Sequence, residues 1–93
     1  MLSFKGVHII AHGIVQGVGF RFFVRERSVQ YGIKGWVRNL PDGTVEIHAE
    51  GEENQLKEFI AKVRQGPSFG HVSRLSIDWI EAGNKYKNFK IVF

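Results

Sequence analysis

Apolar and polar residues alternate with a period of two along several short stretches of the chain, which is the pattern of β-strands that bury one face. In the first stretch, residues 5–13, the apolar side consists of Val7, Ile9 and Ala11. The alternation returns in three later stretches, and a short apolar run marks a last strand. These further strands are predicted at residues 35–40, 44–50 and 72–80 and at Phe89, Ile91 and Phe93.

Two other segments follow the helical period instead. In residues 20–31 the side chains of Phe20, Val24, Ser28 and Tyr31 fall on one stripe, and a glycine follows as a stop signal. The second segment lies after the third predicted strand, with carboxylates at its start, where they suit the helix dipole, and a Gly-Pro pair at its end. Its apolar stripe consists of Leu56, Phe59, Ile60 and Val63.

The predicted order is strand, helix, strand, strand, helix, strand and a short terminal strand. Each helix has one apolar side, and one face of an antiparallel sheet supplies the surface that buries it. We therefore predict an α+β fold, a ferredoxin-like sandwich in which an antiparallel sheet carries both helices on one face. The chain has 93 residues, enough for one core, and no repeat or linker interrupts it, so residues 1–93 are expected to form a single domain.

Composition narrows the class of protein. Thirteen Lys and Arg against nine Asp and Glu give a net charge of +4, which attracts a small anion at least as easily as a nucleic acid. The absence of cysteine excludes disulfides, thiolate metal sites and cysteine nucleophiles. No apolar stretch approaches the roughly 18 residues of a membrane span, and there is no secretion signal. We expect a cytoplasmic monomer with no membrane, nucleic-acid partner, metal or cofactor.

Residues 13–21, with the sequence GIVQGVGFR, carry the most specific chemical signal in the chain. Gly17 and Gly19 can adopt a positive φ, which lets successive backbone N–H groups converge on an anion. The helix that follows adds its positive N-terminal end. Arg21 adds a planar fork of donors that matches two oxygens of a phosphate. This combination predicts a phosphate-binding site.

Several motifs together resemble the acylphosphatase family over nearly the whole chain. They are GIVQGVGFR at residues 13–21, GWVRNLPDGTVE at residues 35–46, AEG at residues 49–51, and Gly66, Pro67 and Val72. The resemblance implies the ferredoxin-like fold and the hydrolysis of acyl phosphates to a carboxylate and inorganic phosphate. Inorganic phosphate, the product, and sulfate are expected to inhibit this hydrolysis. One departure is Ile14, where the family usually carries a basic residue.

The resemblance also implies roles for individual residues. Arg21 matches the phosphate-binding arginine of the family, and Asn39 matches its water-orienting asparagine. The expected phosphate-binding backbone N–H groups belong to Gln16, Gly17, Val18, Gly19, Phe20 and Arg21. The expelled carboxylate is a stable anion, so the reaction needs neither a general acid nor a covalent intermediate, and an oxygen of the substrate phosphate can act as the base.

Each candidate residue also has a purely structural interpretation. Without the preceding glycines, Arg21 would be interpreted as a surface arginine of a helix. Without the family resemblance, Asn39 would be interpreted as a residue that caps the turn at residues 41–43. The four histidines are interpreted as surface residues; His8 and His12 lie about 13 Å apart along one strand, too far to bind one ion together. The two tryptophans, Trp36 and Trp79, are interpreted as parts of the core rather than as ligand platforms.

Two further classes of function remain as alternatives. The run at residues 17–24 superficially resembles the aromatic motif of RNA-binding modules with the same element order, but it precedes a helix instead of lying on the third strand. That third strand presents Thr44, Glu46, His48 and Glu50 outward, which predicts an acidic face without aromatic rings. The other alternative is an anion-binding regulatory domain, or the acylphosphatase-like part of a carbamoyl-transferring maturation enzyme.

Overall fold

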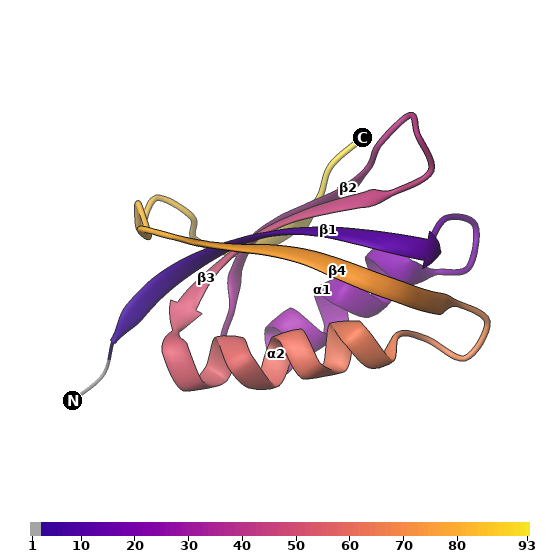
Figure 1. The fold of residues 1–93 in the computed structure, drawn as a ribbon. Helices are drawn as coiled ribbons and strands as arrows, with labels where there is room; N and C mark the ends of the chain where they lie inside the picture. The colour runs from indigo at the N-terminus through magenta and orange to yellow at the C-terminus, as the bar shows by residue number, and fades with distance from the viewer. Residues whose placement is uncertain (1–2) are drawn as a thin grey trace.

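The structure is a computed structural model that describes residues 3–93. Two helices and five strands follow one another in the order that the alternation of residues predicts (Figure 1). The helices are α1 (Phe20–Gln30) and α2 (Glu53–Gln65). The strands are β1 (Phe4–Ile14), β2 (Lys34–Asn39), β3 (Val45–Glu52), β4 (His71–Ile80) and β5 (Phe89–Ile91).

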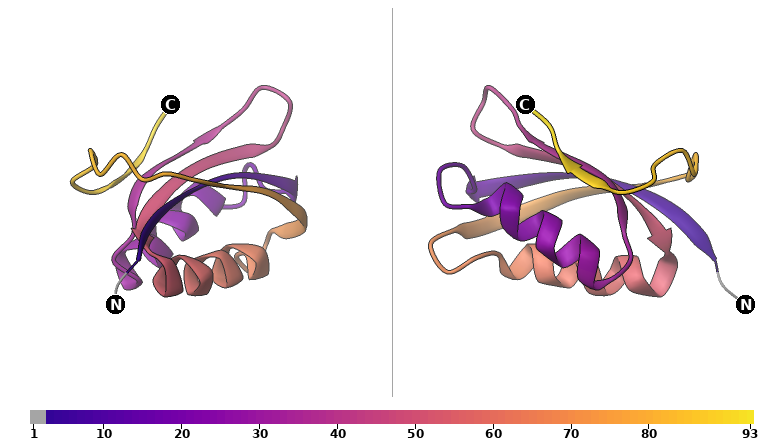
Figure 2. Two further views of the ribbon diagram at one scale, coloured as in Figure 1. Left: turned by 60° about the vertical axis from the view of Figure 1, so that its left-hand side comes forward. Right: turned by 180° about the vertical axis from the view of Figure 1, so that it is seen from behind.

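The five strands form one sheet in the order β4-β1-β3-β2-β5. Strand β1 pairs antiparallel with both β3 and β4, and β2 pairs antiparallel with β3. Both helices lie side by side against one face of this sheet and leave the other face open (Figures 1 and 2). The predicted α+β ferredoxin-like sandwich is confirmed.

The core fills the space between the sheet and the two helices. On β1 the predicted inward residues Val7, Ile9 and Ala11 are fully buried, because strand alternation sends every second side chain to the helix side. The predicted helix stripes also face the core, where Phe59 of α2 meets the ring of Phe89 on β5 at 6.2 Å between centroids. This core holds β1, α1 and β2 in fixed positions, and their ends build the site described below.

The last strand differs from the prediction in two respects. It runs parallel to β2, so the sheet is mixed at this edge rather than wholly antiparallel. It also ends at Ile91, so Phe93, which was predicted to belong to this strand, lies beyond it, and its side chain is fully exposed. The chain can leave the sheet after Ile91 because, among residues 3–93, β2 is the only strand that pairs with β5.

The two tryptophans do not lie in the core as expected. Trp79 is 46% exposed on the edge strand β4, which pairs only with β1 among the residues that the structure describes. Trp36 lies on the open face of the sheet, where its ring stacks on that of His48 on the neighbouring strand. The sequence pattern does not reveal this, because Trp36 is followed by Val37 and Trp79 by Ile80, and two consecutive apolar residues do not show which of them faces the core.

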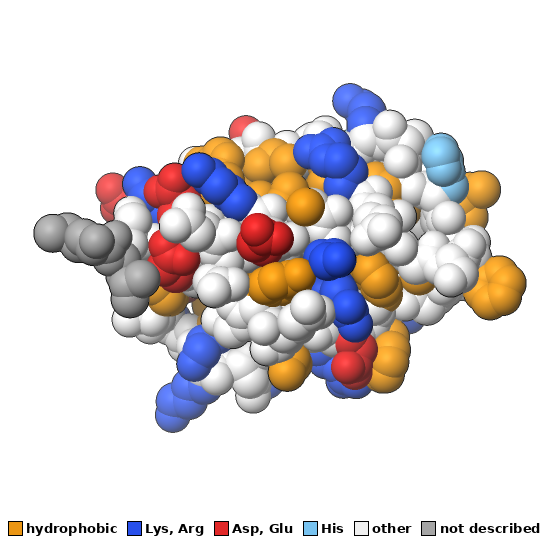
Figure 3. All heavy atoms as spheres, turned by 90° about the horizontal axis from the view of Figure 1, so that it is seen from below, with side chains coloured by type: hydrophobic (Ala, Val, Ile, Leu, Met, Phe, Trp, Pro, Cys, Tyr) orange, Lys and Arg blue, Asp and Glu red, His pale blue; other side chains and the backbone are white. Residues whose placement is uncertain are grey.

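The third strand presents Glu46, His48 and Glu50 to the open face, as predicted, but residues from other segments bring aromatic rings to this face. Glu50 is 3% exposed, since the backbone N–H groups of Gly83 and Asn84 cover its carboxylate. The rings of Trp36 and Tyr86 lie beside it on the same face of the sheet, joined by His48. The helix side has a different surface, on which Lys, Arg, Asp and Glu side chains are interspersed with apolar ones (Figure 3). No helix among residues 3–93 is long and apolar enough to cross a membrane.

Candidate active site

The loop between β1 and α1 has the backbone conformation that its glycines predict. Gly17 and Gly19 adopt φ angles of 73° and 76°, in the left-handed region that favours glycine. A Cβ atom added at either position would meet no heavy atom within 4 Å. Glycine is therefore required for backbone conformation rather than for space.

The backbone donors of this loop are free to bind an anion. Gly19 is the N-cap of α1, and the first hydrogen bond of the helix runs from the N–H of Phe23 to the carbonyl of Gly19. Within residues 3–93, no hydrogen bond uses the N–H groups of residues 16–21. These donors lie at the positive end of the helix, which is the arrangement that binds phosphate groups in many folds.

A cavity of about 180 Å³ opens beside this loop. Of the predicted site residues it brings together Gly17, Gly19, Phe20, Arg21 and Asn39. Gln16 and Val18, which were also predicted to belong to the site, are not among the residues that line the cavity. The rest of its wall is apolar and consists of Val15, Phe22, Ile91 and Phe93.

Arg21 and Asn39 enter this cavity from different elements. Arg21 lies on the first turn of α1, and its guanidinium carbon is 4.9 Å from the centroid of the Phe93 ring. Within the described part of the chain Arg21 forms no ion pair, so its charge is uncompensated. Asn39 is the last residue of β2, and its side-chain oxygen Oδ1 is buried without a hydrogen-bond partner among residues 3–93. A buried polar atom of this kind calls for a hydrogen-bond donor from outside the protein chain, such as an ordered water molecule or a bound group.

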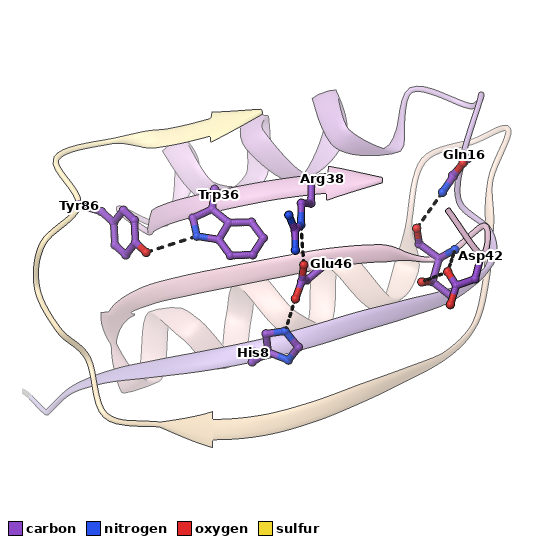
Figure 4. Close-up of polar contacts among 8 residues, drawn as sticks. His8, Gln16, Trp36, Arg38, Asp42, Glu46 and Tyr86 are labelled. Atoms are coloured by element: carbon purple, nitrogen blue, oxygen red, sulfur yellow. Dashed lines mark hydrogen bonds and ion pairs between the residues drawn. The ribbon is translucent and has the colours of Figure 1, made fainter. Parts of the chain in front are cut away.

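The side chain of Gln16 has a role that the sequence did not reveal. Its Nε2 donates to the carbonyl oxygens of Leu40 and Thr44, each at 2.8 Å, and so ties the glycine loop to the turn after β2 (Figure 4). This turn begins directly after Asn39. Two elements far apart in sequence are thereby held in register, a contact that no local pattern of residues can predict.

The turn itself is ordered by Asp42. Its Oδ1 accepts from the hydroxyl of Thr44 at 2.6 Å and from the N–H of the same residue at 3.0 Å. These two hydrogen bonds, that from the hydroxyl first, hold the pKa of Asp42 below its ordinary value. The predicted role of Asp42 as a turn residue agrees with these contacts.

The histidines lie outside the cavity, and three of them have partners. His8 contacts Glu46 at 2.7 Å, His12 contacts Ser76 at 3.2 Å, and His48 contacts Glu50 at 2.9 Å. His71, at the start of β4, is exposed. The paired histidines thus belong to side-chain networks of the open sheet face rather than standing free on the surface.

These networks shift the acidity of two carboxylates. Burial raises the pKa of Glu46, but hydrogen bonds from His8 and Arg38 outweigh it, and the net pKa lies below the ordinary value. Burial likewise raises the pKa of Glu50, and hydrogen bonds from His48 and from two backbone N–H groups reverse the direction. Both carboxylates are therefore ionised at neutral pH.

Comparison with known proteins assigns this architecture to a family. The family model described as Acylphosphatase matches residues 7–91, which include the glycine loop, Arg21 and Asn39. The chain belongs to the acylphosphatase family. Its members hydrolyse acyl phosphates, and the chain is accordingly an enzyme of acyl phosphate hydrolysis, as the resemblance of its motifs predicts.

Individual relatives span nearly the same length. An acylphosphatase of Chlorobaculum tepidum is 44% identical over 88 residues, which cover 95% of this chain and 96% of the relative. The crystal structure of acylphosphatase from Bacillus subtilis superimposes with a TM-score of 0.93 at 40% identity, over 96% of this chain and 99% of that one.

The same fold also forms part of a much longer protein. In the crystal structure of full-length HypF in its phosphate- and nucleotide-bound form, a segment matches all of this chain with a TM-score of 0.86 and 33% identity. The matched part is 12% of the HypF chain.

Proposed function

We propose that the chain hydrolyses acyl phosphates in the cavity between the glycine loop and the end of β2. The phosphoryl group binds to the N–H groups of residues 16–21 and to the guanidinium of Arg21. Asn39 holds the attacking water. The observation that carries this proposal is that Asn39, whose Oδ1 has no hydrogen-bond partner among residues 3–93, lines the same cavity as Gly17, Gly19 and Arg21.

The cavity has the charge that the reaction requires. Negative charge on the phosphoryl oxygens has to be neutralised while the bond to the acyl oxygen breaks. The unused N–H groups at the N-terminus of α1 and the uncompensated guanidinium of Arg21 are both donors of this kind. They stand on a loop and helix fixed by the core, so the donors are oriented before the substrate arrives.

Asn39 contributes the geometry of attack. Its amide oxygen accepts a hydrogen bond from a water molecule, and the water oxygen attacks the phosphorus in line with the leaving group. A new P–O bond forms, the bond from phosphorus to the acyl oxygen breaks, and the carboxylate leaves with the electron pair. The proton released by the water passes to an oxygen of the phosphoryl group.

The proposed reaction requires no general acid and no covalent intermediate, because a carboxylate is a stable leaving group without protonation. It also requires no metal ion or cofactor, since backbone N–H donors and one guanidinium neutralise the negative charge on the phosphoryl oxygens. The histidines belong to networks outside the cavity. We therefore expect turnover with no steep dependence on a group that titrates near the ordinary pKa of histidine, about 6.5.

The test is hydrolysis of an aryl acyl phosphate by the purified chain in the presence of a chelator. The variant Asn39→Ala should lower kcat by about 10²- to 10³-fold, the loss typical of one oriented polar group at a reacting centre. Inhibition by inorganic phosphate should remain, because the N–H groups of residues 16–21 and the guanidinium of Arg21 are unchanged in this variant. Asn54→Ala, an exposed asparagine of α2, is the matched control and should keep full activity. Normal turnover of Asn39→Ala would remove this residue from the mechanism.

A further inference from the structure

A second cavity lies on the open face of the sheet, along the edge formed by β2 and β5. Its volume is about 390 Å³, within the range of small-molecule sites. The chain between β4 and β5 forms one side of it, and the other side consists of β2. Its lining residues are Gly35, Trp36, Lys85, Tyr86, Lys87, Asn88, Lys90 and Val92. We call it the open-face groove.

The indole of Trp36 forms the aromatic wall of this groove. On the side of β3 it is covered by His48, with ring centroids 5.9 Å apart and planes 15° from parallel. On the side of β5 it stands opposite Lys90 in the strand register and lines the groove. Its Nε1 donates to the hydroxyl of Tyr86 at 3.3 Å, which fixes the orientation of the ring (Figure 4). The guanidinium of Arg38 also lies over this ring, 5.4 Å from its centroid. The part of the indole that a ligand can contact is therefore the part that lines the groove, beside Tyr86.

Positive charge surrounds this aromatic wall. Lys85, Lys87 and Lys90 are exposed, and within residues 3–93 none of them forms an ion pair. No carboxylate is among the residues that line the groove. The chain that carries two of these lysines is anchored to the sheet, because the N–H groups of Gly83 and Asn84 bind Glu50.

The nearest acidic side chains of this face are already engaged. Glu46 is bound by Nε of Arg38 at 2.6 Å and by His8 at 2.7 Å, so that these residues cross the sheet in a row (Figure 4). Glu50 is buried under its own hydrogen bonds. The lysines of the groove therefore keep a local excess of positive charge.

We propose that the open-face groove binds a nucleoside phosphate, with the base packed against the parts of Trp36 and Tyr86 that line the groove and the phosphate groups on Lys85, Lys87 and Lys90. A flat ring that carries an anionic tail matches an aromatic wall bordered by lysines. A single nucleotide suits the groove better than a nucleic-acid strand. A strand that continued across the sheet would meet Glu46 and the exposed Asp78, and their charges would repel its phosphates.

This groove is separate from the phosphate cavity. Along β2 and β5 successive side chains alternate between the two faces of the sheet, so Trp36 and Lys90 point to the opposite side from Asn39 and Ile91. The two sites can be tested independently.

The experiment is a fluorescence titration with ADP. The chain has two tryptophans, so Trp79→Phe leaves Trp36 as the only one. In this background ADP should quench the emission in a saturable manner, whereas adenosine and pyrophosphate, which offer the ring or the charge alone, should bind about tenfold more weakly or worse. The combined variant Lys85→Ala, Lys87→Ala, Lys90→Ala should weaken ADP binding by about tenfold or more and keep full hydrolytic activity.

Two controls separate this site from the others. Replacing Lys5, Lys57 and Lys62 by alanine removes the same charge elsewhere and should leave ADP binding unchanged. Arg21→Ala should also leave it unchanged, since Arg21 lines the other cavity. The proposal is overturned if ADP does not quench Trp36, if the two lysine variants behave alike, or if a single-stranded oligonucleotide binds while ADP does not.

Discussion

Arg21 is the residue on which the charge of the proposed active site depends. It stands in the first turn of α1, forms no ion pair within residues 3–93, and lines the cavity with Asn39. A guanidinium without an ion-pair partner, beside N–H groups that form no hydrogen bond among residues 3–93, gives this cavity a positive charge. We infer that it binds the phosphoryl group of the substrate and the phosphate product alike.

The variant Arg21→Ala should therefore lose both turnover and product inhibition. We expect kcat/KM to fall by at least about 10³-fold, because the guanidinium neutralises charge that grows in the transition state. Steady-state kinetics with and without inorganic phosphate measure both effects. Arg74→Ala, on the edge strand β4, is the control for loss of a positive charge. Full phosphate inhibition of Arg21→Ala would refute the role of this residue.

The residues of the site differ in how far the sequence predicts them. The positive φ angles of Gly17 and Gly19 follow from a local property of glycine, so the motif alone indicates them. The burial of Asn39 depends on the packing of β2 against β5 and α1, which residue type does not encode. Without the family resemblance, its interpretation as a turn residue was the simpler one.

The β1–α1 loop and the β2–β3 turn act as one unit because Gln16 joins them. Its amide donates to Leu40 and Thr44, while these carbonyls also accept backbone hydrogen bonds from Gly43 and Leu40 respectively. Loss of the Gln16 side chain therefore leaves neither carbonyl unpaired. It frees the glycine loop from the turn that follows Asn39.

Gln16→Ala should cost about 1–2 kcal/mol of stability, the worth of two hydrogen bonds. We also expect a larger fold-change in kcat than in the inhibition constant for phosphate. Phosphate still binds to the variant, but the attacking water is less well oriented. Thermal unfolding and kinetics, compared with those of the exposed Gln30→Ala, measure these effects. A variant that loses stability with unchanged kcat would make Gln16 a structural residue only.

Secondary structure was predictable where one period dominates. The stripes of α1 and α2 and the alternation of β1 each match a single template, and the structure confirms them. The pairing of β5 was not predictable, since a strand of three residues carries no signal for its neighbour or direction. The face of Trp36 was not predictable because the adjacent pair Trp36 and Val37 does not show which of the two is buried. In the structure Val37 is fully buried, so strand alternation places Trp36 on the open face.

The stability of the whole molecule should depend on its carboxylate networks in acid. The pKa values of Glu46 and Glu50 are lowered in the folded protein, so the unfolded chain binds more protons in acid. The stability that they contribute is present above the ordinary glutamate pKa of about 4.3 and is lost as the pH falls through the folded values. The free energy of unfolding should thus decline below about pH 4.5.

Glu46→Gln should flatten this decline. At neutral pH the variant should be less stable than the parent, and the difference should shrink as the pH falls, because protonation removes the same charge from the parent. Urea unfolding at a series of pH values measures it, with the exposed Glu58→Gln as the control. Identical acid profiles for Glu46→Gln and the parent would contradict this assignment.

Binding of inorganic phosphate, followed by amide NMR of the labelled chain, is the decisive test of the proposed phosphate site, because each N–H group of the molecule reports separately. We predict that the signals of residues 16–21 shift together, with a dissociation constant equal to the inhibition constant of the hydrolysis reaction. Phosphate that inhibits hydrolysis while these amide signals stay unmoved would contradict it.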